Sequence, residues 1–283
     1  MTAHTAGSVH AVWSPAALAA DVGQPIVVLV HGAMDRSASF GRAVRLLGDV
    51  PVVRYDRRGY GHSTELGVGD LDAHVRDLRG LIAGRPSVLV GHSIGGVIAL
   101  VAAEGDPSVL SVAAWEASMA WAPWWPSSSA GSSVLASTAG NGTGENGMDD
   151  EEAGDAAERF MCKMIGVERW SRLPTSTRVA RRAEGRALIA DIAALHRNAA
   201  PYDVAALTQP VLAGYGTGSR PYHQQAAREL ATTVADAELM VVQGADHGAH
   251  LSHATEFATF VRRAVARAAT IPGTTIPGTT LRP

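Results

Sequence analysis

Residues 87–103 read Ser-Val-Leu-Val-Gly-His-Ser-Ile-Gly-Gly-Val-Ile-Ala-Leu-Val-Ala-Ala. The first four residues form a short apolar run, which is typical of a strand buried on both faces of a sheet. Residues Ile94–Ala103 contain no helix breaker after Gly96 and favour a helix. Between the two lies Gly91-His92-Ser93-Ile94-Gly95. This pattern predicts a sharp strand-to-helix turn that projects a serine hydroxyl above the sheet edge.

The chemistry of this turn depends on its serine. A serine hydroxyl is a weak nucleophile unless a base removes its proton. The flanking glycines let neighbouring backbone approach, and the helix N-terminus favours negative charge that develops nearby. The Gly-x-Ser-x-Gly spacing alone occurs by chance about 0.2 times in such a chain, so the flanking strand and helix are what make it specific. We therefore predict that Ser93 is a nucleophile.

Short apolar runs alternate with segments of helical spacing on both sides of this turn. Such alternation is the pattern of a mostly parallel α/β sheet with right-handed crossovers. The predicted strands are Ile26–Val30, Val52–Tyr55, Ser87–Val90, Val109–Trp115, Pro210–Ala213 and Leu239–Val242. The predicted helices are Ser39–Leu47, Leu71–Ala83, Ile94–Ala103, Ala156–Gly166, Arg178–Arg197, His223–Ala231 and Ala254–Ala268.

The alternation stops after residue 117 and resumes at residue 208. We therefore expect a core formed by residues 1–117 and 208–269, with residues 118–207 inserted as a helical cap or lid. Within the insert, residues 127–154 are dense in Ser, Gly, Ala, Asn and acidic residues, and we expect a flexible segment there. The sequence Thr-Ile-Pro-Gly-Thr occurs twice from Thr270, and residues 270–283 are expected to be a disordered tail.

Composition excludes several classes of protein. The 24 basic and 27 acidic residues give a net charge of −3, which argues against a nucleic-acid binder. A single cysteine, Cys162, excludes a disulfide within the chain and a four-cysteine zinc site. No apolar run approaches the roughly 18 residues of a membrane span, and the first twenty residues carry no Lys or Arg for a signal peptide. We expect a cytoplasmic protein with a small-molecule substrate, and its oligomeric state stays open.

A second motif, Val-Leu-Val-His-Gly-Ala-Met at residues 28–34, ends a strand in a loop. Acyl transfer needs donors aimed at an oxyanion, and backbone N–H groups in such a loop supply them. We predict an oxyanion hole formed by the N–H of Ala33 or Met34 together with that of Ile94, directly after the nucleophile. The His31 side chain is expected to brace this loop, and we group it with the pocket residues.

A third motif, Tyr-Asp-Arg-Arg-Gly-Tyr-Gly-His-Ser at residues 55–63, follows another strand. We interpret it as a turn in which Asp56 and Arg57 pair or cap backbone groups. In this order, the three motifs resemble the α/β-hydrolase family over residues 26–116 and 208–268. The resemblance implies an eight-stranded, mostly parallel sheet and a catalytic triad in the order nucleophile, acid, histidine. It implies no metal, nucleotide or flavin cofactor.

The triad histidine of this family follows the last strand, and here Gly-Ala-Asp-His at residues 244–247 follows Leu239–Val242. By this resemblance His247 is the general base. His250 and His253 are chemical competitors, and three histidines within seven residues also suggest a metal. Their loop spacing lacks a clustered carboxylate partner, so we expect no metal site. His250 is placed in the pocket or behind the base.

The acid is where the chain departs from the family pattern. The residue matching the usual aspartate is Ser219, and no carboxylate lies between Pro210 and Glu229. A serine cannot hold a compensating charge beside an imidazolium. Some relatives place the acid after the strand before the insert, where this chain has Glu116. We predict that Glu116 accepts the His247 Nδ1–H. The alternatives are that Glu116 only braces the cap, or that Asp246 or Asp35 is the triad acid.

Tryptophan is concentrated at the start of the insert, where four of the six tryptophans fall within eleven residues. Tryptophan supplies a large apolar surface with one polar N–H. We expect either a pocket wall under a lid or packing of the cap onto the core. The pocket residues expected on this basis, together with the histidines near the motifs, are His31, His92, Trp115, Trp121, Trp124, Trp125 and His250.

These observations favour a serine hydrolase of the carboxylesterase type, acting on small or medium apolar esters through an acyl-enzyme on Ser93. Thioester hydrolysis, C–C bond hydrolysis and acyl transfer fit the same triad. A ligand-binding member of the fold with little turnover is the alternative from another class, and Ser219 at the usual acid position motivates it.

Overall fold

The sheet of the computed structural model, which describes residues 2–3, 8–139 and 149–270, has eight strands in the order β1-β2-β4-β3-β5-β6-β7-β8. The two pairings of β2 are antiparallel, and all pairings from β4 to β8 are parallel. This confirms the predicted mostly parallel sheet. The strands are β1 Thr2–Ala3, β2 Ala11–Trp13, β3 Ile26–Val30, β4 Val52–Tyr55, β5 Ser87–His92, β6 Val109–Trp115, β7 Val211–Gly216 and β8 Ala237–Val242.

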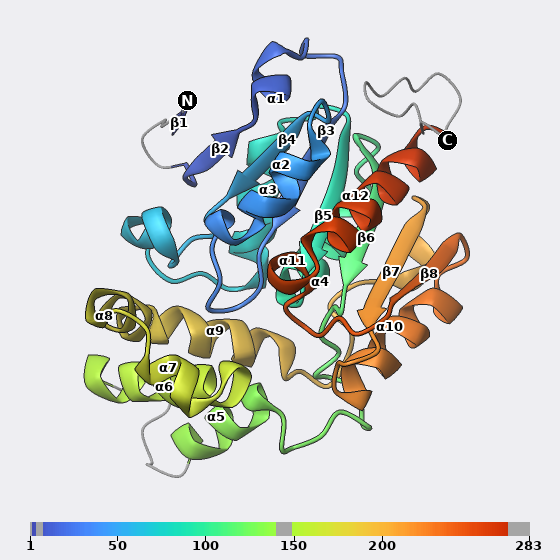
Figure 1. The fold of residues 1–283 in the computed structure, drawn as a ribbon. Coiled ribbons are helices and arrows are strands. Elements are labelled where there is room, and N and C mark those ends of the chain that lie inside the picture. Colours follow the sequence, from blue (N-terminus) through green and yellow to red (C-terminus); the bar gives the residue numbers. More distant parts are fainter. Residues whose placement is uncertain (1, 4–7, 140–148, 271–283) are drawn as a thin grey trace.

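Helices cover both faces of the sheet (Figure 1). One apolar cluster joins β3, β5 and β6 to α2 and α12, and another joins the opposite face to α3, α4 and α10. No helix in the described ranges combines the length and apolar character needed to cross a membrane. The helices of the core are α1 Pro15–Ala19, α2 Gly41–Leu47, α3 Leu71–Ile82, α4 Ile94–Ala103, α10 Pro221–Thr233, α11 Ala249–Ser252 and α12 Ala254–Ala268, with 3-10 turns at Ser37–Phe40, Gly61–Leu66 and Val204–Ala206.

Among the described residues, five further helices lie between β6 and β7 in the chain and gather beside the ends of the strands (Figure 1), and they are called the cap below. They are α5 Ala130–Ala139, α6 Asp150–Ile165, α7 Val167–Ser171, α8 Thr175–Ala183 and α9 Gly185–Leu195. The prediction of a segment without structure over residues 127–154 is wrong for most of that range, because α5 and the start of α6 occupy it. Residues 140–148 of that range, and 271–283 of the predicted tail, lie outside the described residues.

At the N-terminus of α6, a local capping motif favours a helix although the composition of the segment indicated a flexible chain. Asp149 accepts a hydrogen bond from the Glu152 N–H, and the Glu152 side chain reaches back to the Asp149 N–H. Such a capping box satisfies two backbone donors that a helix start leaves without partners. In α5, packing against α9 stabilises the helix: a Cβ on Gly131 would lie 3.4 Å from Ile192 and His196.

A buried ionic cluster ties the cap to the core. Asp191 on α9 accepts two hydrogen bonds from the Arg57 guanidinium, at 3.0 and 2.6 Å. It also lies 3.0 Å from His74 Nε2 and accepts the Tyr60 hydroxyl at 2.6 Å. Arg57 therefore pairs with Asp191 and not with Asp56. The Asp56 carboxylate caps backbone groups, as the alternative interpretation expected: it accepts the His62 N–H of its own turn and the Ser37 N–H of the loop after β3.

Changing Asp191 to asparagine is expected to lower the free energy of unfolding by about 3–5 kcal/mol. The reason is that both Arg57 and Asp191 are buried, so the variant leaves the arginine charge without its partner. Urea denaturation checks this. Asp155→Asn is the matched control, because Asp155 pairs with Arg182 while half exposed, and it should cost less than about 1 kcal/mol. Equal effects of the two variants would contradict a buried cap–core link.

Candidate active site

Ser93 sits at the turn between β5 and α4 with φ 57° and ψ −126°, a backbone conformation that non-glycine residues rarely adopt. The turn is possible because two glycines flank it. A Cβ on Gly91 would overlap the Gly95 carbonyl, and a Cβ on Gly95 would overlap the Val30 carbonyl. The Ser93 N–H bonds the Trp115 carbonyl at 2.9 Å, which fixes the turn against the end of β6.

Glu116 and His247 meet beside this turn. Glu116 directly follows β6, and His247 follows β8 in the loop before α11. His247 Nδ1 lies 2.8 Å from Glu116 Oε2, and the glutamate side chain is fully buried. A carboxylate on Nδ1 fixes the imidazole tautomer that leaves Nε2 free to accept a proton. The contact brings together two of the residues that we predicted as a triad.

The other carboxylate oxygen of Glu116 is held by the segment where the family usually carries its aspartate. The Gly216 N–H donates to Glu116 Oε1 at 3.0 Å, and the Ser219 hydroxyl donates to the same oxygen. Ser219 therefore contributes a hydrogen bond in place of a charge. Three hydrogen-bond donors on one buried carboxylate fix its orientation toward His247.

Ser93 and His247 both line one pocket, but the serine hydroxyl has another partner. Within the described residues, Ser93 Oγ has a hydrogen-bond contact to Ser118 Oγ, at 3.3 Å, and none to His247. In this structure the Ser93 hydroxyl is therefore not yet hydrogen-bonded to the predicted base. Catalytic hydrogen bonds are often loose without substrate and tighten in the complex.

Two of the three predicted oxyanion-hole residues border the pocket. Ile94 is the first residue of α4, so its N–H has no partner within the helix and is free to donate. Ala33 lies on the loop after β3 and lines the same pocket. Met34 has φ 56° and its side chain is buried in an apolar cluster with Tyr60 and cap residues such as Leu188.

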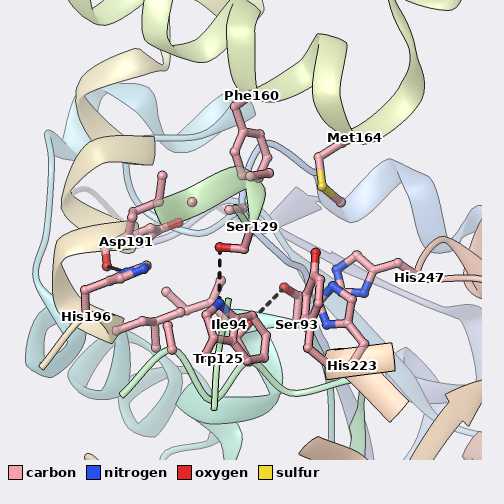
Figure 2. A pocket seen from close by; sticks show the side chains of 18 residues that line it. Ser93, Ile94, Trp125, Ser129, Phe160, Met164, Asp191, His196, His223 and His247 are labelled. Atoms are coloured by element: carbon pink, nitrogen blue, oxygen red, sulfur yellow. Dashed lines mark hydrogen bonds between the residues drawn. The ribbon is translucent and has the colours of Figure 1, made fainter. Parts of the chain in front are cut away.

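The pocket lies between the core and the cap and contains about 520 Å³ of space, part of it open to solvent. Figure 2 shows Ser93, His223 and His247 close together, with Phe160 and Met164 of α6 on the opposite side. Its cap wall is mainly apolar. The apolar residues that line it from the cap and its approach are Ala120, Trp125, Ala130, Phe160, Met164, Ile192 and Leu195.

Among the residues expected at the pocket wall, Trp125 lies there and the others lie elsewhere. Trp115 is fully buried and packs edge-on against Phe260, 5.3 Å between ring centroids, on the α12 face of the sheet. Trp121 packs edge-on against Tyr202. The Trp124 ring lies 6.0 Å from that of Trp125, and Trp124 is not among the residues that line the pocket. The tryptophan cluster thus serves packing more than binding, which was the other alternative.

The three histidines expected at the pocket support the loops around it. His31 Nδ1 donates to the Gly32 carbonyl at 2.7 Å, and its Nε2 accepts the Arg57 N–H at 2.9 Å. His250 Nε2 lies 3.0 Å from Asp35 Oδ2, so Asp35 is engaged away from the base. The buried His92 ring lies between those of His247 and His250, at 4.5 and 4.6 Å.

Several residues on the wall were not anticipated from the sequence. His223 and Tyr222 come from the start of α10, and Ser118 follows Glu116 by two residues. Ser129 and His196 come from the cap. The segment after Ser219 could have been identified as part of the pocket from the sequence. It follows a strand at the carboxyl edge of the sheet, where sites form in α/β proteins. The cap residues carry no motif that would single them out.

Three groups of described residues place possible metal ligand atoms within 4.8 Å of one another. One contains Glu116, His223 and His247, and an ion there would replace the 2.8 Å glutamate–histidine hydrogen bond. The others are Asp35 with His92 and His250, and Asp56 with His10 and His62. His253 belongs to none of them, so the three histidines of the loop do not form one cluster.

Stability should fall as pH drops from about 6.5 to 4. Burial and the nearby Arg57 charge lower the pKa of His31 to about 4, and burial also lowers the pKa of His92 and His223 well below its usual value. Below the unfolded pKa of about 6.5, the unfolded chain gains protons that the folded chain excludes. For His31 alone, this destabilises by on the order of 2 kcal/mol at pH 5.

Urea denaturation at a series of pH values measures this effect. The His31→Gln variant removes one of the titrating groups, so its stability should depend less steeply on pH between 6.5 and 4. A free energy of unfolding that stays constant from pH 7.5 to 5 in the unchanged protein would contradict the assignment of buried neutral histidines.

Comparisons with known proteins agree with this architecture. The model of the alpha/beta hydrolase family matches residues 27–260. An alpha/beta hydrolase from Sphaerobacter thermophilus is 24% identical, with 92% of this chain and 99% of that chain covered and a TM-score of 0.65. A thermophilic esterase from Thermogutta terrifontis is 20% identical, with 94% of this chain and 97% of that chain covered and a TM-score of 0.65. An enol-lactonase from Burkholderia xenovorans is 18% identical, with 94% of this chain and 100% of that chain covered and a TM-score of 0.65. No curated protein matches the chain by sequence.

Proposed function

Since the chain belongs to the alpha/beta hydrolase family, we propose that it is a serine hydrolase that cleaves small or medium, mainly apolar carboxylic esters through an acyl-enzyme on Ser93. The observation that carries the proposal is the 2.8 Å contact between His247 Nδ1 and Glu116 Oε2 in the pocket wall that also holds Ser93. A ligand-binding protein with little turnover has no need of a buried acid that orients a histidine beside a strained serine.

In the first half of the reaction, Ser93 Oγ attacks the ester carbonyl carbon while His247 Nε2 accepts the hydroxyl proton. The carbonyl oxygen becomes an oxyanion, which the N–H groups of Ile94 and Ala33 stabilise. The Glu116 carboxylate stabilises the imidazolium that forms on His247. When the tetrahedral intermediate collapses, the C–O bond to the alcohol breaks and His247 returns its proton to the leaving oxygen.

In the second half, water repeats the sequence on the acyl-enzyme. His247 Nε2 takes a proton from the water as its oxygen attacks the acyl carbon, and the same N–H groups hold the new oxyanion. Collapse breaks the bond to Ser93 Oγ, His247 protonates that oxygen, and the carboxylic acid leaves. An alcohol or amine in place of water would give acyl transfer with the same residues.

The size and lining of the pocket limit the substrate. The space of about 520 Å³ between the core and the cap includes a part that is open to solvent. Phe160, Met164 and Leu195 give the cap side an apolar surface. An ester with a short or medium apolar group fits this lining. A long acyl chain would have to extend into solvent and would gain less from burial.

Turnover of p-nitrophenyl esters from acetate to dodecanoate tests the proposal. We expect release of p-nitrophenol, with kcat/KM highest among the acetate, butyrate and hexanoate esters and lower for the dodecanoate. Absence of turnover on every ester of the series would overturn the ester proposal. Turnover of an acyl thioester at a higher kcat/KM than the matched oxygen ester would identify a thioesterase instead.

A further inference from the structure

His223 occupies an unusual place beside the catalytic base. It is the third residue of α10 and its side chain is 5% exposed. Its ring stacks on that of His247 with 4.2 Å between centroids and an interplanar angle of 19°. The Trp125 ring meets it edge-on at 5.4 Å. The imidazole is therefore held between the base and the wall of the cap, and it lines the pocket (Figure 2).

The polar atoms of His223 are not used by the protein. A neutral imidazole offers one N–H donor and one nitrogen acceptor. Nδ1 of His223 is buried without a hydrogen-bond partner, and no hydrogen bond to its side chain is formed within the described residues. Burial, with the neighbouring His247 and Arg220, lowers the pKa of His223 well below its usual value and keeps the ring neutral. A buried polar group without a partner costs free energy. Nε2 also forms no hydrogen bond within the described residues, and it is the ring nitrogen left for a ligand in the pocket that His223 lines.

The polar side chains of Trp125, Ser129 and His196, which also line the pocket, are already engaged in hydrogen bonds with one another or with their neighbours. Trp125 Nε1–H donates to Ser129 Oγ at 3.2 Å, and the Ser129 hydroxyl donates to Ser132 Oγ at 2.8 Å. His196 Nδ1–H donates to the Ile192 carbonyl at 2.8 Å, so its Nε2 accepts the Ser132 hydroxyl at 2.9 Å. This chain of hydrogen bonds is complete without a substrate.

We propose that His223 binds an oxygen atom of the substrate close to the scissile ester, so that the preferred esters carry an ether, hydroxyl or carbonyl oxygen beside an otherwise apolar group. The stacking of the two rings fixes where this oxygen would bind. His247 must reach both Ser93 and the leaving oxygen, and the centroid of the His223 ring lies 4.2 Å from that of the His247 ring. This inference rests on the proposed ester hydrolysis and adds a second, polar requirement to the apolar pocket.

A pair of isosteric substrates tests this inference. p-Nitrophenyl methoxyacetate differs from p-nitrophenyl butyrate by one ether oxygen in place of a methylene group. His223→Phe keeps an aromatic ring against His247 and removes the hydrogen bond. We expect it to lower kcat/KM for the methoxyacetate about tenfold more than for the butyrate, since one buried hydrogen bond contributes roughly this factor. His223→Gln, which restores a donor and an acceptor, should recover part of the selectivity.

The outcomes are distinguishable. An unchanged ratio of the two kcat/KM values in His223→Phe would overturn the inference and leave ester hydrolysis intact. A loss of selectivity in Tyr222→Phe but not in His223→Phe would also overturn it, because the adjacent phenol would then be the binding group. Should His223→Phe not fold, His223→Leu provides the same comparison. Failure of the unchanged protein on both esters would instead overturn the proposed function.

Discussion

Changing Glu116 to glutamine is expected to lower kcat/KM for p-nitrophenyl butyrate by about 10³–10⁴-fold, by analogy with other triad-acid substitutions. The glutamine would keep the shape of the site, but it carries no charge to stabilise the imidazolium. Its amide N–H₂ can also face His247 Nδ1, which would favour the tautomer with the proton on Nε2. That tautomer cannot accept the Ser93 proton.

A neighbouring carboxylate supplies the matched control for this variant. Asp246 adjoins the base in sequence, yet its Oδ1 accepts the Gly248 N–H at 2.9 Å in the loop. Asp246→Asn keeps an oxygen that can accept this N–H, so it should change kcat/KM by less than about fivefold. If Glu116→Gln retained the rate of the unchanged protein, Glu116 would be a structural residue and the acid would have to be sought elsewhere.

Changing Ser93 to alanine is expected to lower kcat by on the order of 10⁶-fold, as removal of the nucleophile does in other serine hydrolases with a triad. The residual rate would come from the oxyanion donors and from substrate binding alone. The alanine keeps the φ of 57° at the turn, so the fold should be retained, and a thermal melt verifies this.

Ser118 provides a stringent comparison because its hydroxyl lies 3.3 Å from that of Ser93 in the same pocket. Ser118→Ala removes one neutral hydrogen bond and should lower kcat less than about tenfold. A loss in Ser118→Ala as large as that in Ser93→Ala would mean that the two hydroxyls act together, or that Ser118 is the nucleophile.

Much of the core could be predicted because buried parallel strands have a simple sequence pattern. β3, β4 and β6 begin and end at the predicted residues, as do α4 and α12. Glu116 could be placed beside the site because the carboxyl ends of neighbouring parallel strands meet at one edge. The role of Ser219 could not be predicted, since only the folded loop shows that its hydroxyl donates to Glu116.

The pocket wall was harder to predict because it depends on which way each side chain points. Successive residues of a strand face opposite sides of the sheet. Trp115 ends β6 on the face covered by α12, although Glu116 next to it turns toward the base. The helices of the cap were harder still to predict from the sequence. Helix α5 is composed mostly of small residues, and contacts with α9, far away in sequence, stabilise it.

The central claim is that Ser93 is a nucleophile activated by His247, and covalent labelling tests it most directly. A fluorophosphonate reacts with an activated serine, and mass spectrometry of the intact protein and of its peptides counts and locates the adduct. We predict one phosphonyl group, on Ser93, in the unchanged protein and none in Ser93→Ala. Absence of labelling, or an adduct on a different residue while esters are still hydrolysed, would contradict the account.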